Sequence, residues 1–291
     1  MTSARLVYVI SPAKTLDLSI SSISQCSQPR LLLKTHQLVE ELQKLSQAKV
    51  KSLLKVNDTL AKLNYDRYQM FDMSNTATKA QHPSVTLKQA ALTFNGPAYQ
   101  SLNAYTLSER DLEFAQHHLC ILSGLYGILR PLDLIQPYRL EMGQKFSTSK
   151  GQDLYDFWGK NLIVELDAMF CKQEAQDKVK LPRILINLAS QEYFKCLSQS
   201  ALETAGITVV NCVFQDDERV MSLEDVSKFH VEGYQFSTLA SNSQTFVFQR
   251  SNKDQKVGRQ KMTKKSLAKR ETREDEHKDE MKLQVRAKRA K

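Results

Sequence analysis

The sequence has few of the patterns that mark membrane, secreted or metal-binding proteins. No apolar run approaches the ~18 residues of a membrane-spanning helix, and the N-terminal apolar run is too short for a signal peptide. The five cysteines are scattered, odd in number and without a C-x-x-C pair, which argues against a disulfide framework or a zinc site. We therefore expect a cytoplasmic protein with no membrane partner, no bound metal and no cofactor.

Motifs of the common enzyme classes are also missing. The six histidines show no metal-ligand spacing, and their scarcity argues against a Ser-His-Asp triad. The sequence contains neither the phosphate loop G-x-x-x-x-G-K-[ST] nor the dinucleotide motif G-x-G-x-x-G. These absences argue against an enzymatic activity but do not exclude one.

Positive charge is concentrated at one end of the chain. The net charge is +9, from 41 basic and 32 acidic residues. Residues 250–291 hold 16 of the basic and 7 of the acidic residues, so residues 1–249 hold 25 of each and are neutral. We therefore predict a body of residues 1–250 and a basic tail of residues 251–291. The tail is interpreted either as an arm that binds nucleic acid or another polyanion, or as a solvated segment without a partner.

Within the body, strand-like and helix-like segments alternate. This order predicts an α+β (mixed α/β) fold, with a single mixed β-sheet flanked by helices. Ser108 and Asp111 form a capping-box pattern at the start of one helix, and Asp58 is the expected N-cap of another. The expected strands are 5–10, 119–122, 183–190, 207–215 and 246–250, and the expected helical segments are 29–45, 50–71 (two helices broken near 57–58), 106–119 and 153–170.

Three polar segments directly follow expected strands: SPAKTL (11–16), SGLYGILRPLDLIQPYRLEMG (123–143) and NLASQEYFK (187–195). If these strands are neighbours, their carboxyl ends meet at one edge of the sheet, where α/β proteins commonly bind ligands. We expect such a site to suit a small anionic or nucleobase-like ligand, with arginine as the clamp and glutamate as acid or base. The candidate residues are Lys14, Arg130, Tyr138, Arg139, Glu141, Asn187, Glu192 and Tyr193.

The segment 123–143, called here the signature stretch, also has a purely structural interpretation. Its arginines can form internal ion pairs, Arg130 with Asp133 and Arg139 with Glu141, and such pairs resemble functional sites. Its glycines permit close backbone approach or positive φ. Under either interpretation we expect a packed apolar face made by Leu125, Ile128, Leu129 and Leu132.

Together with LNYDRYQMF (63–71) and LYDFWG (154–159), these segments resemble the peroxide-stress protein YaaA family, also called UPF0246 or DUF328, in the family's own order over roughly residues 6–220. The resemblance implies a cytosolic, single-domain α/β protein, for which we favour a monomer. It also implies a role in limiting iron-driven damage by hydrogen peroxide, and DNA binding through a helix-hairpin-helix-like element. The best candidate for that element is 52–68, with the DNA-binding candidates Lys51, Lys55, Lys62 and Arg67.

The sequence departs from the family pattern in three places. The candidate hairpin has no glycine in its turn, and a solvated helix face explains the same four cations. In FNGPAY (94–99), Asn95 and Pro97 stand where the family usually shows Lys and Asp. A family segment carrying a basic cluster is missing near residue 220, next to the acidic QDDE (215–218).

Overall fold

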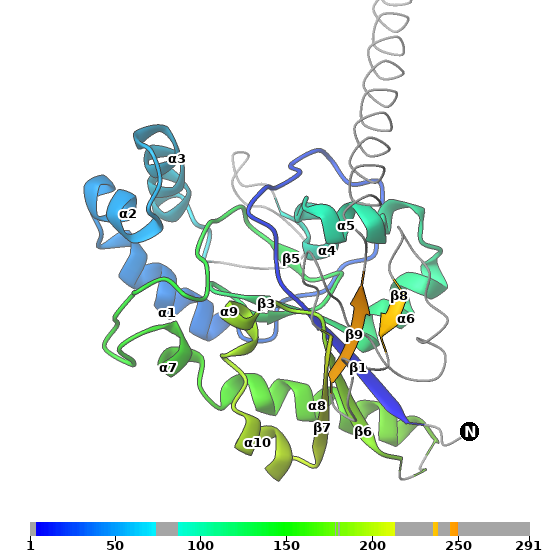
Figure 1. Ribbon diagram of the computed structural model, residues 1–291. Coiled ribbons are helices and arrows are strands. Elements are labelled where there is room, and N and C mark those ends of the chain that lie inside the picture. Colours follow the sequence, from blue (N-terminus) through cyan, green and yellow to red (C-terminus); the bar gives the residue numbers. More distant parts are fainter. Residues whose placement is uncertain are drawn as a thin grey trace, which may run out of the picture. The chain divides into compact units, whose positions relative to one another are not determined.

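The computed structural model describes residues 4–73, 87–177, 179 and 181–212, together with two later strands, Gln235–Ser237 and Thr245–Gln249 (Figure 1). The chain divides into two compact units, Met1–Val210 and Asn211–Lys291. The predicted basic tail, the QDDE segment and the predicted gap near residue 220 lie outside the described residues.

The first unit is built on a mixed sheet, as the sequence predicts. Its strands lie in the order β4-β3-β1-β6-β7. The central strand β1 pairs in parallel with β3 on one side and with β6 on the other, whereas β4 runs antiparallel to β3. Their bounds are β1 Arg5–Ile10, β3 Leu119–Ser123, β4 Gly127–Leu129, β6 Arg183–Asn187 and β7 Ile207–Cys212.

Alternating side chains explain the position of β1. Val7 and Val9 are fully buried, while the residues between them are only partly buried, which is the two-residue period of a strand packed against a core. The core also contains the fully buried Trp158 and Phe170. The predicted apolar face of the signature stretch is confirmed, since all four of its members are buried, namely Leu125, Ile128, Leu129 and Leu132.

Helices and one small sheet surround these strands (Figure 1). The small sheet pairs β2 (Lys88–Gln89) antiparallel with β5 (Leu134–Ile135). No helix in the described ranges is long and apolar enough to cross a membrane. The helices are α1 Leu32–Gln43, α2 Gln47–Leu54, α3 Asp58–Gln69, α4 Ala90–Thr93, α5 Pro97–Leu102, α6 Glu109–His118, α7 Leu154–Trp158, α8 Asn161–Asp177, α9 Gln191–Phe194 and α10 Gln199–Thr204, with a 3-10 turn at Ala104–Thr106.

Helix ends follow local capping chemistry, which corrects two predictions. The capping box of Ser108 and Asp111 is present at α6. The N-cap of α3, however, is Asn57 rather than Asp58, because the Asn57 side chain accepts the backbone N–H of Leu60. The predicted single helix over 153–170 is two helices, α7 and α8. They are separated at Gly159, whose φ of +44° ends α7.

The second unit contains the remaining described strands. β9 (Thr245–Gln249) pairs antiparallel with β8 (Gln235–Ser237). Thr245 and Phe246 of β9 pair in parallel with Asn211 and Cys212, the last two residues of β7. The predicted strand at 246–250 therefore exists, displaced by one residue.

Candidate ligand site at the carboxyl ends of the strands

The loops that follow β1 and β6 are joined directly. Leu188 donates its backbone N–H to the carbonyl of Val9 at 2.9 Å, one step beyond the paired residues of the two strands. The hydroxyl of Ser11 then accepts the backbone N–H of Ser190 at 2.9 Å. Because β3, β1 and β6 are parallel neighbours, the three polar segments do meet at one edge of the sheet.

Buried tyrosines line this edge. Tyr138 shares a 2.6 Å hydrogen bond with Ser123 at the end of β3, and Tyr99 donates to the Ser11 carbonyl at 2.9 Å. Burial raises the pKa values of Tyr99, Tyr138 and Tyr193 above their usual range. These phenols therefore stay neutral and can act as hydrogen-bond donors or acceptors.

Two carboxylates are fixed beside the tyrosines. Glu141 pairs with Arg139 at 2.9 Å and accepts a second hydrogen bond from Gln144 at 3.0 Å. Glu192 accepts the backbone N–H of Gly143 at 3.0 Å. Burial raises the pKa of Tyr193, and the negative charges of Glu141 and Glu192 add to the shift, so both acids lie near this phenol.

Arg139 and Lys14 supply unengaged positive charge. Arg139 bonds Glu141 through Nε, while its two terminal nitrogens have no hydrogen-bond partner in the described part of the chain. Its side chain is 22% exposed, so these nitrogens can reach solvent or a ligand. Lys14 is exposed, and its ammonium has no ion-pair partner among the described residues. A guanidinium anchored at one nitrogen and open at the other two is suited to clamp an oxyanion.

Two predicted site residues form hydrogen bonds within the fold. Arg130 follows β4, which runs antiparallel to β3 and carries the chain back toward the amino end of the sheet. There its guanidinium bonds Asp133 at 2.8 Å and the Gln28 carbonyl at 3.1 Å, so the structure does not bring Arg130 to the other candidates. Asn187 lies at the end of β6 and accepts the backbone N–H of Ala189 at 2.9 Å, which shapes the turn into the site.

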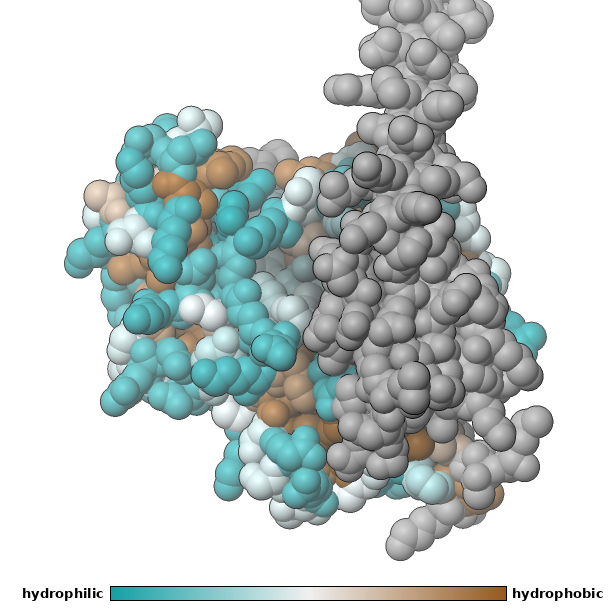
Figure 2. All heavy atoms as spheres, viewed as in Figure 1, coloured by the Kyte–Doolittle hydropathy of each residue, from teal (hydrophilic) through white to brown (hydrophobic). Residues whose placement is uncertain are grey.

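The predicted DNA-binding element forms a pair of packed helices, α2 and α3 (Figure 1). The turn between them begins at Lys55, which has the left-handed conformation (φ 51°, ψ 51°) that glycine usually supplies. A hairpin turn is therefore formed without glycine. Polar side chains cover most of this element, with apolar side chains between them (Figure 2).

The four cations of the hairpin differ in their partners. Lys51 pairs with Asp58 at 2.8 Å, and Lys62 pairs with Asp66 at 2.7 Å. Lys55 is exposed and has no ion pair with any described residue. Arg67 is partly buried, burial lowers its pKa, and its closest side-chain partner is Asn64 at 3.4 Å.

Contacts that the sequence did not predict connect the hairpin to the candidate site. The fully buried Tyr68 of α3 donates its hydroxyl to the carbonyl of Arg139. Asp72 and Gln136 exchange two hydrogen bonds, of 2.9 and 2.8 Å. The signature stretch thus holds α3 and the residues just after it, through the Arg139 carbonyl and the side-chain amide of Gln136. In the sequence, the one hint of this connection was that LNYDRYQMF (63–71) occurs together with the signature stretch (123–143).

Metal-binding groups do not gather in the described part of the chain. Among those residues, no cluster of three or more His, Cys, Asp or Glu side chains is placed to hold a metal ion. The described strand ends offer tyrosine hydroxyls, two carboxylates and an open guanidinium.

Comparison with known proteins gives consistent matches over most of the chain. A family model described as "Peroxide stress protein YaaA" matches residues 6–221. A UPF0246 protein of Burkholderia mallei (strain SAVP1) is 38% identical over 268 residues, covering 84% of this chain and 98% of the relative. A UPF0246 protein of Burkholderia thailandensis is 39% identical over the same length, with the same coverage of both chains.

Proposed function

The chain belongs to the peroxide stress protein YaaA family, also known as UPF0246, and from this premise we propose that it binds DNA without strong sequence preference. In this role it acts in the cytoplasm, as a monomer, and limits the damage that iron and hydrogen peroxide do to DNA. The protection is indirect, because the protein covers DNA rather than binding iron itself.

The observation that carries this proposal is the turn between α2 and α3. Lys55 adopts the left-handed conformation there, so the chain reverses tightly and α3 begins at an exposed N-terminus, Asn57–Asp58. Helix N-termini attract phosphate through their unpaired N–H groups and their dipole. The ammonium of Lys55 adds an unpaired positive charge at the same turn. Lys51 lies nearby and is neutralised by Asp58 in the free protein.

The basic tail supports the same proposal. Residues 251–291 hold 15 basic and 7 acidic residues, a net charge of +8 out of the +9 of the whole chain. Lysine and arginine that neutralise DNA phosphates release counterions, which gives affinity that is independent of sequence and falls with salt. We propose that the hairpin positions the duplex and that the tail adds affinity.

Fluorescence anisotropy with a labelled duplex, measured over a range of salt concentrations, tests this function. We expect tight binding at low salt, with log Kd linear in log salt concentration. Lys55→Gln should lower the slope by about 1, and removal of residues 251–291 by several. Lys160→Gln is the matched control, since Lys160 is an exposed lysine in the turn before α8. The function fails if the full chain does not bind at low salt, or if binding ignores salt.

A missing family segment bears on how much of the activity this chain keeps. The alignment with the first relative runs over 268 positions but covers 84% of the 291 residues, which is about 244 of them. About two dozen aligned positions (268 less 244) therefore have no residue here. This number is consistent with a lost segment, which we propose to lie near residue 220, and we propose that the basic tail supplies part of the lost charge.

A second candidate function is favoured by the open guanidinium of Arg139. A small anionic or nucleobase-like ligand at the strand ends would meet Arg139, two fixed carboxylates and the neutral phenols of Tyr138 and Tyr193. Thermal-shift screening with nucleobases, nucleotides and phosphate tests it. A ligand-induced shift that disappears in Arg139→Ala and persists in Arg110→Ala, an exposed arginine of α6, would support this function. The absence of any shift would count against it.

A further inference from the structure

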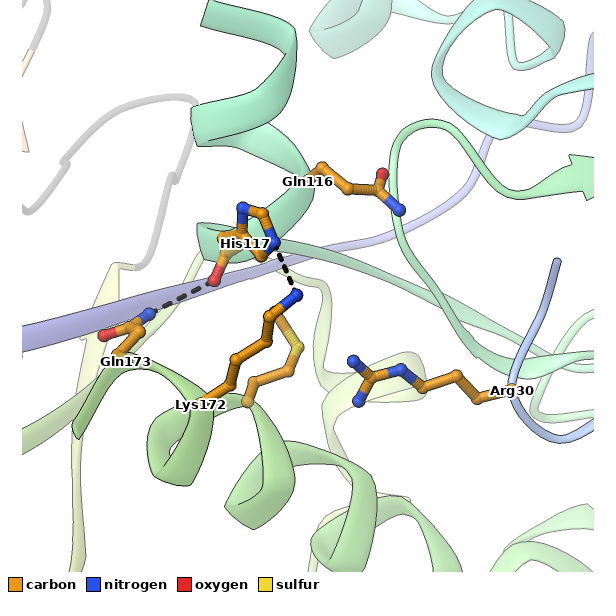
Figure 3. A pocket seen from close by; sticks show the side chains of 6 residues that line it. Arg30, Gln116, His117, Lys172 and Gln173 are labelled. Carbon is orange, nitrogen blue, oxygen red and sulfur yellow. Dashed lines mark hydrogen bonds between the residues drawn. The ribbon is translucent and has the colours of Figure 1, made fainter. Parts of the chain in front are cut away.

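A separate hollow lies at the other end of the sheet, between α6 and α8 (Figure 3). It is close to the amino ends of β1 and β3, because Gln173 donates to the carbonyls of Leu6 and His117, at 3.2 and 3.1 Å. The lining residues are Arg30, Gln116, His117, Met169, Lys172 and Gln173. None of them belongs to the hairpin or to the strand-end site.

Lys172 is the unusual member of this group. Its ammonium lies 2.8 Å from Nε2 of His117, and a lysine ammonium can only donate. Nε2 must therefore be the bare nitrogen of a neutral ring, and Nδ1 carries the proton that it donates to the Glu113 carbonyl at 2.9 Å. Within the described residues, the positive charge of Lys172 has no carboxylate partner.

Arg30 brings a second cation to the same hollow. One terminal nitrogen pairs with Glu165 at 3.2 Å, and its other nitrogens have no partner in the described ranges. Figure 3 shows the guanidinium pointing toward the space beside Lys172. Among the described residues, Glu165 therefore pairs with Arg30 alone, and the ammonium of Lys172 is left without a carboxylate.

The amide side chains around the hollow are already engaged. Gln116 donates to the Ser27 hydroxyl at 2.7 Å and accepts the backbone N–H of Leu132 at 2.8 Å. Gln173 is held by the two carbonyls given above. The walls are thus fixed by internal hydrogen bonds, and the donors left for a ligand are the cationic ones.

We propose that this hollow binds a small oxyanion of the phosphate or sulfate type, held by Lys172 and Arg30. Charge-assisted hydrogen bonds from an ammonium and a guanidinium are the interactions that favour such anions. The same chemistry is offered by free phosphate and by a phosphate of the DNA backbone. The proposal does not depend on the function proposed for the hairpin.

Binding of the anion is coupled to a proton on His117. In the free protein, burial lowers the pKa of His117 below its ordinary value of 6.5, and Lys172 lowers it further. The other charged groups near the ring are Glu113 and His118 of α6, and Glu165 beside Arg30. An anion between the cations offsets the repulsion and raises this pKa. Nε2 then takes up a proton, Lys172 donates to the anion instead of to Nε2, and affinity increases as the pH falls through the ordinary range of histidine.

Thermal denaturation of the full chain with low-millimolar sulfate, against sodium chloride of equal ionic strength, tests the site. We expect sulfate to raise Tm by about 2–4 °C, and by more at pH values below the ordinary pKa of histidine. Lys172→Gln should lose most of the rise, Lys172→Arg should keep it, and Lys160→Gln should behave like the wild type. An equal rise in wild type and Lys172→Gln, or no rise beyond that in chloride, overturns the proposal.

Two further measurements complete the test. Histidine NMR should show that sulfate raises the pKa of His117 in the wild type and not in Lys172→Gln; an unchanged pKa in both contradicts the coupling. Duplex binding then distinguishes the source of the anion. A salt slope lowered by about 1 in Lys172→Gln identifies a DNA phosphate. An unchanged slope in this variant, together with sulfate binding by the wild type, identifies a free oxyanion.

Discussion

The two halves of the signature stretch contain similar residues and do different things. Residues 123–133 pass through the β3–β4 turn to the amino end of the sheet, where Arg130 meets Asp133 at 2.8 Å. Residues 134–143 return to the carboxyl ends of the strands, where Arg139 meets Glu141 at 2.9 Å. Both pairs join an arginine to a nearby acid, yet Arg130 engages Nε and Nη2, whereas Arg139 engages Nε alone and keeps both terminal nitrogens for a ligand.

The difference lies in how many hydrogen bonds each acid receives. Asp133 is 1% exposed and accepts from the Ser27 hydroxyl, from the Arg130 backbone N–H and from two guanidinium nitrogens. Glu141 accepts from one nitrogen of Arg139 and from Gln144. The pair whose buried acid accepts four hydrogen bonds holds the fold together, and the pair whose arginine keeps both terminal nitrogens open can bind a ligand. The variants below test this distinction, from the largest expected effect to the smallest.

Asp133→Ala should have the largest effect. It leaves Arg130, the Ser27 hydroxyl and a backbone N–H without their partner, and loss of one member of a buried pair costs about 3–5 kcal/mol. Urea unfolding measures the change. Asp66→Ala removes an exposed acid paired with Lys62, and it should change stability by less than about 1 kcal/mol. Equal costs for the two variants would show that Asp133 is not a structural centre.

Gly127→Ala should follow, because it tests the β3–β4 turn that carries the first half to the amino end of the sheet. Gly127 has a φ of +71°, and an added Cβ would lie 2.7 Å from the Trp158 ring. Backbone strain and overpacking together should cost about 2–4 kcal/mol. Gly206→Ala is the matched control, since Gly206 has a φ of +68° with no atom within 4 Å of an added Cβ. The control should cost about 1–2 kcal/mol; identical urea midpoints would exclude a packing role for Trp158.

Tyr68→Phe tests whether the hairpin is held by the second half of the signature stretch, residues 134–143. It removes the hydroxyl that donates to the Arg139 carbonyl in a buried place, which should cost about 1–3 kcal/mol of unfolding free energy. Tyr65→Phe on the same helix is the control, because the Tyr65 hydroxyl has no partner in the described ranges and its loss should be near neutral. If Tyr68→Phe is equally neutral, the hairpin is not held through Arg139.

The sequence predicted elements that short-range patterns determine. The alternation around Val7 and Val9 and the capping box at Ser108 needed only a few neighbouring residues. The turn at Lys55 was harder to predict, because left-handed backbone is usually assigned to glycine. The prediction of a single helix over 153–170 was wrong, because one glycine within an amphipathic pattern does not by itself indicate that a helix ends there.

The candidate site was predicted only in part, for a related reason. Neighbouring parallel strands bring their following loops together, so the meeting of residues 11–16 with 187–195 could be expected. The position of Arg130 depended on the β3–β4 reversal, which no local pattern near Arg130 reveals. Contacts such as Tyr68 with Arg139 join residues 71 positions apart, and one sequence contains no information on such pairing.

Arg139→Gln should have the smallest effect on stability and a large one on binding. Its side chain is 22% exposed, and the ion pair engages a single nitrogen, so loss of this hydrogen bond should cost about 1 kcal/mol. Glu141 is buried and loses its cation, but it keeps the hydrogen bond from Gln144. The same change at Arg130 leaves the almost fully buried Asp133 without its cation, and should cost several times more. Urea midpoints of Arg139→Gln and Arg130→Gln compare the stability of the two halves. The Tm shifts that anionic ligands cause in each variant compare their binding. If Arg139→Gln is as destabilising as Arg130→Gln and leaves every ligand shift intact, both halves of the signature stretch are structural.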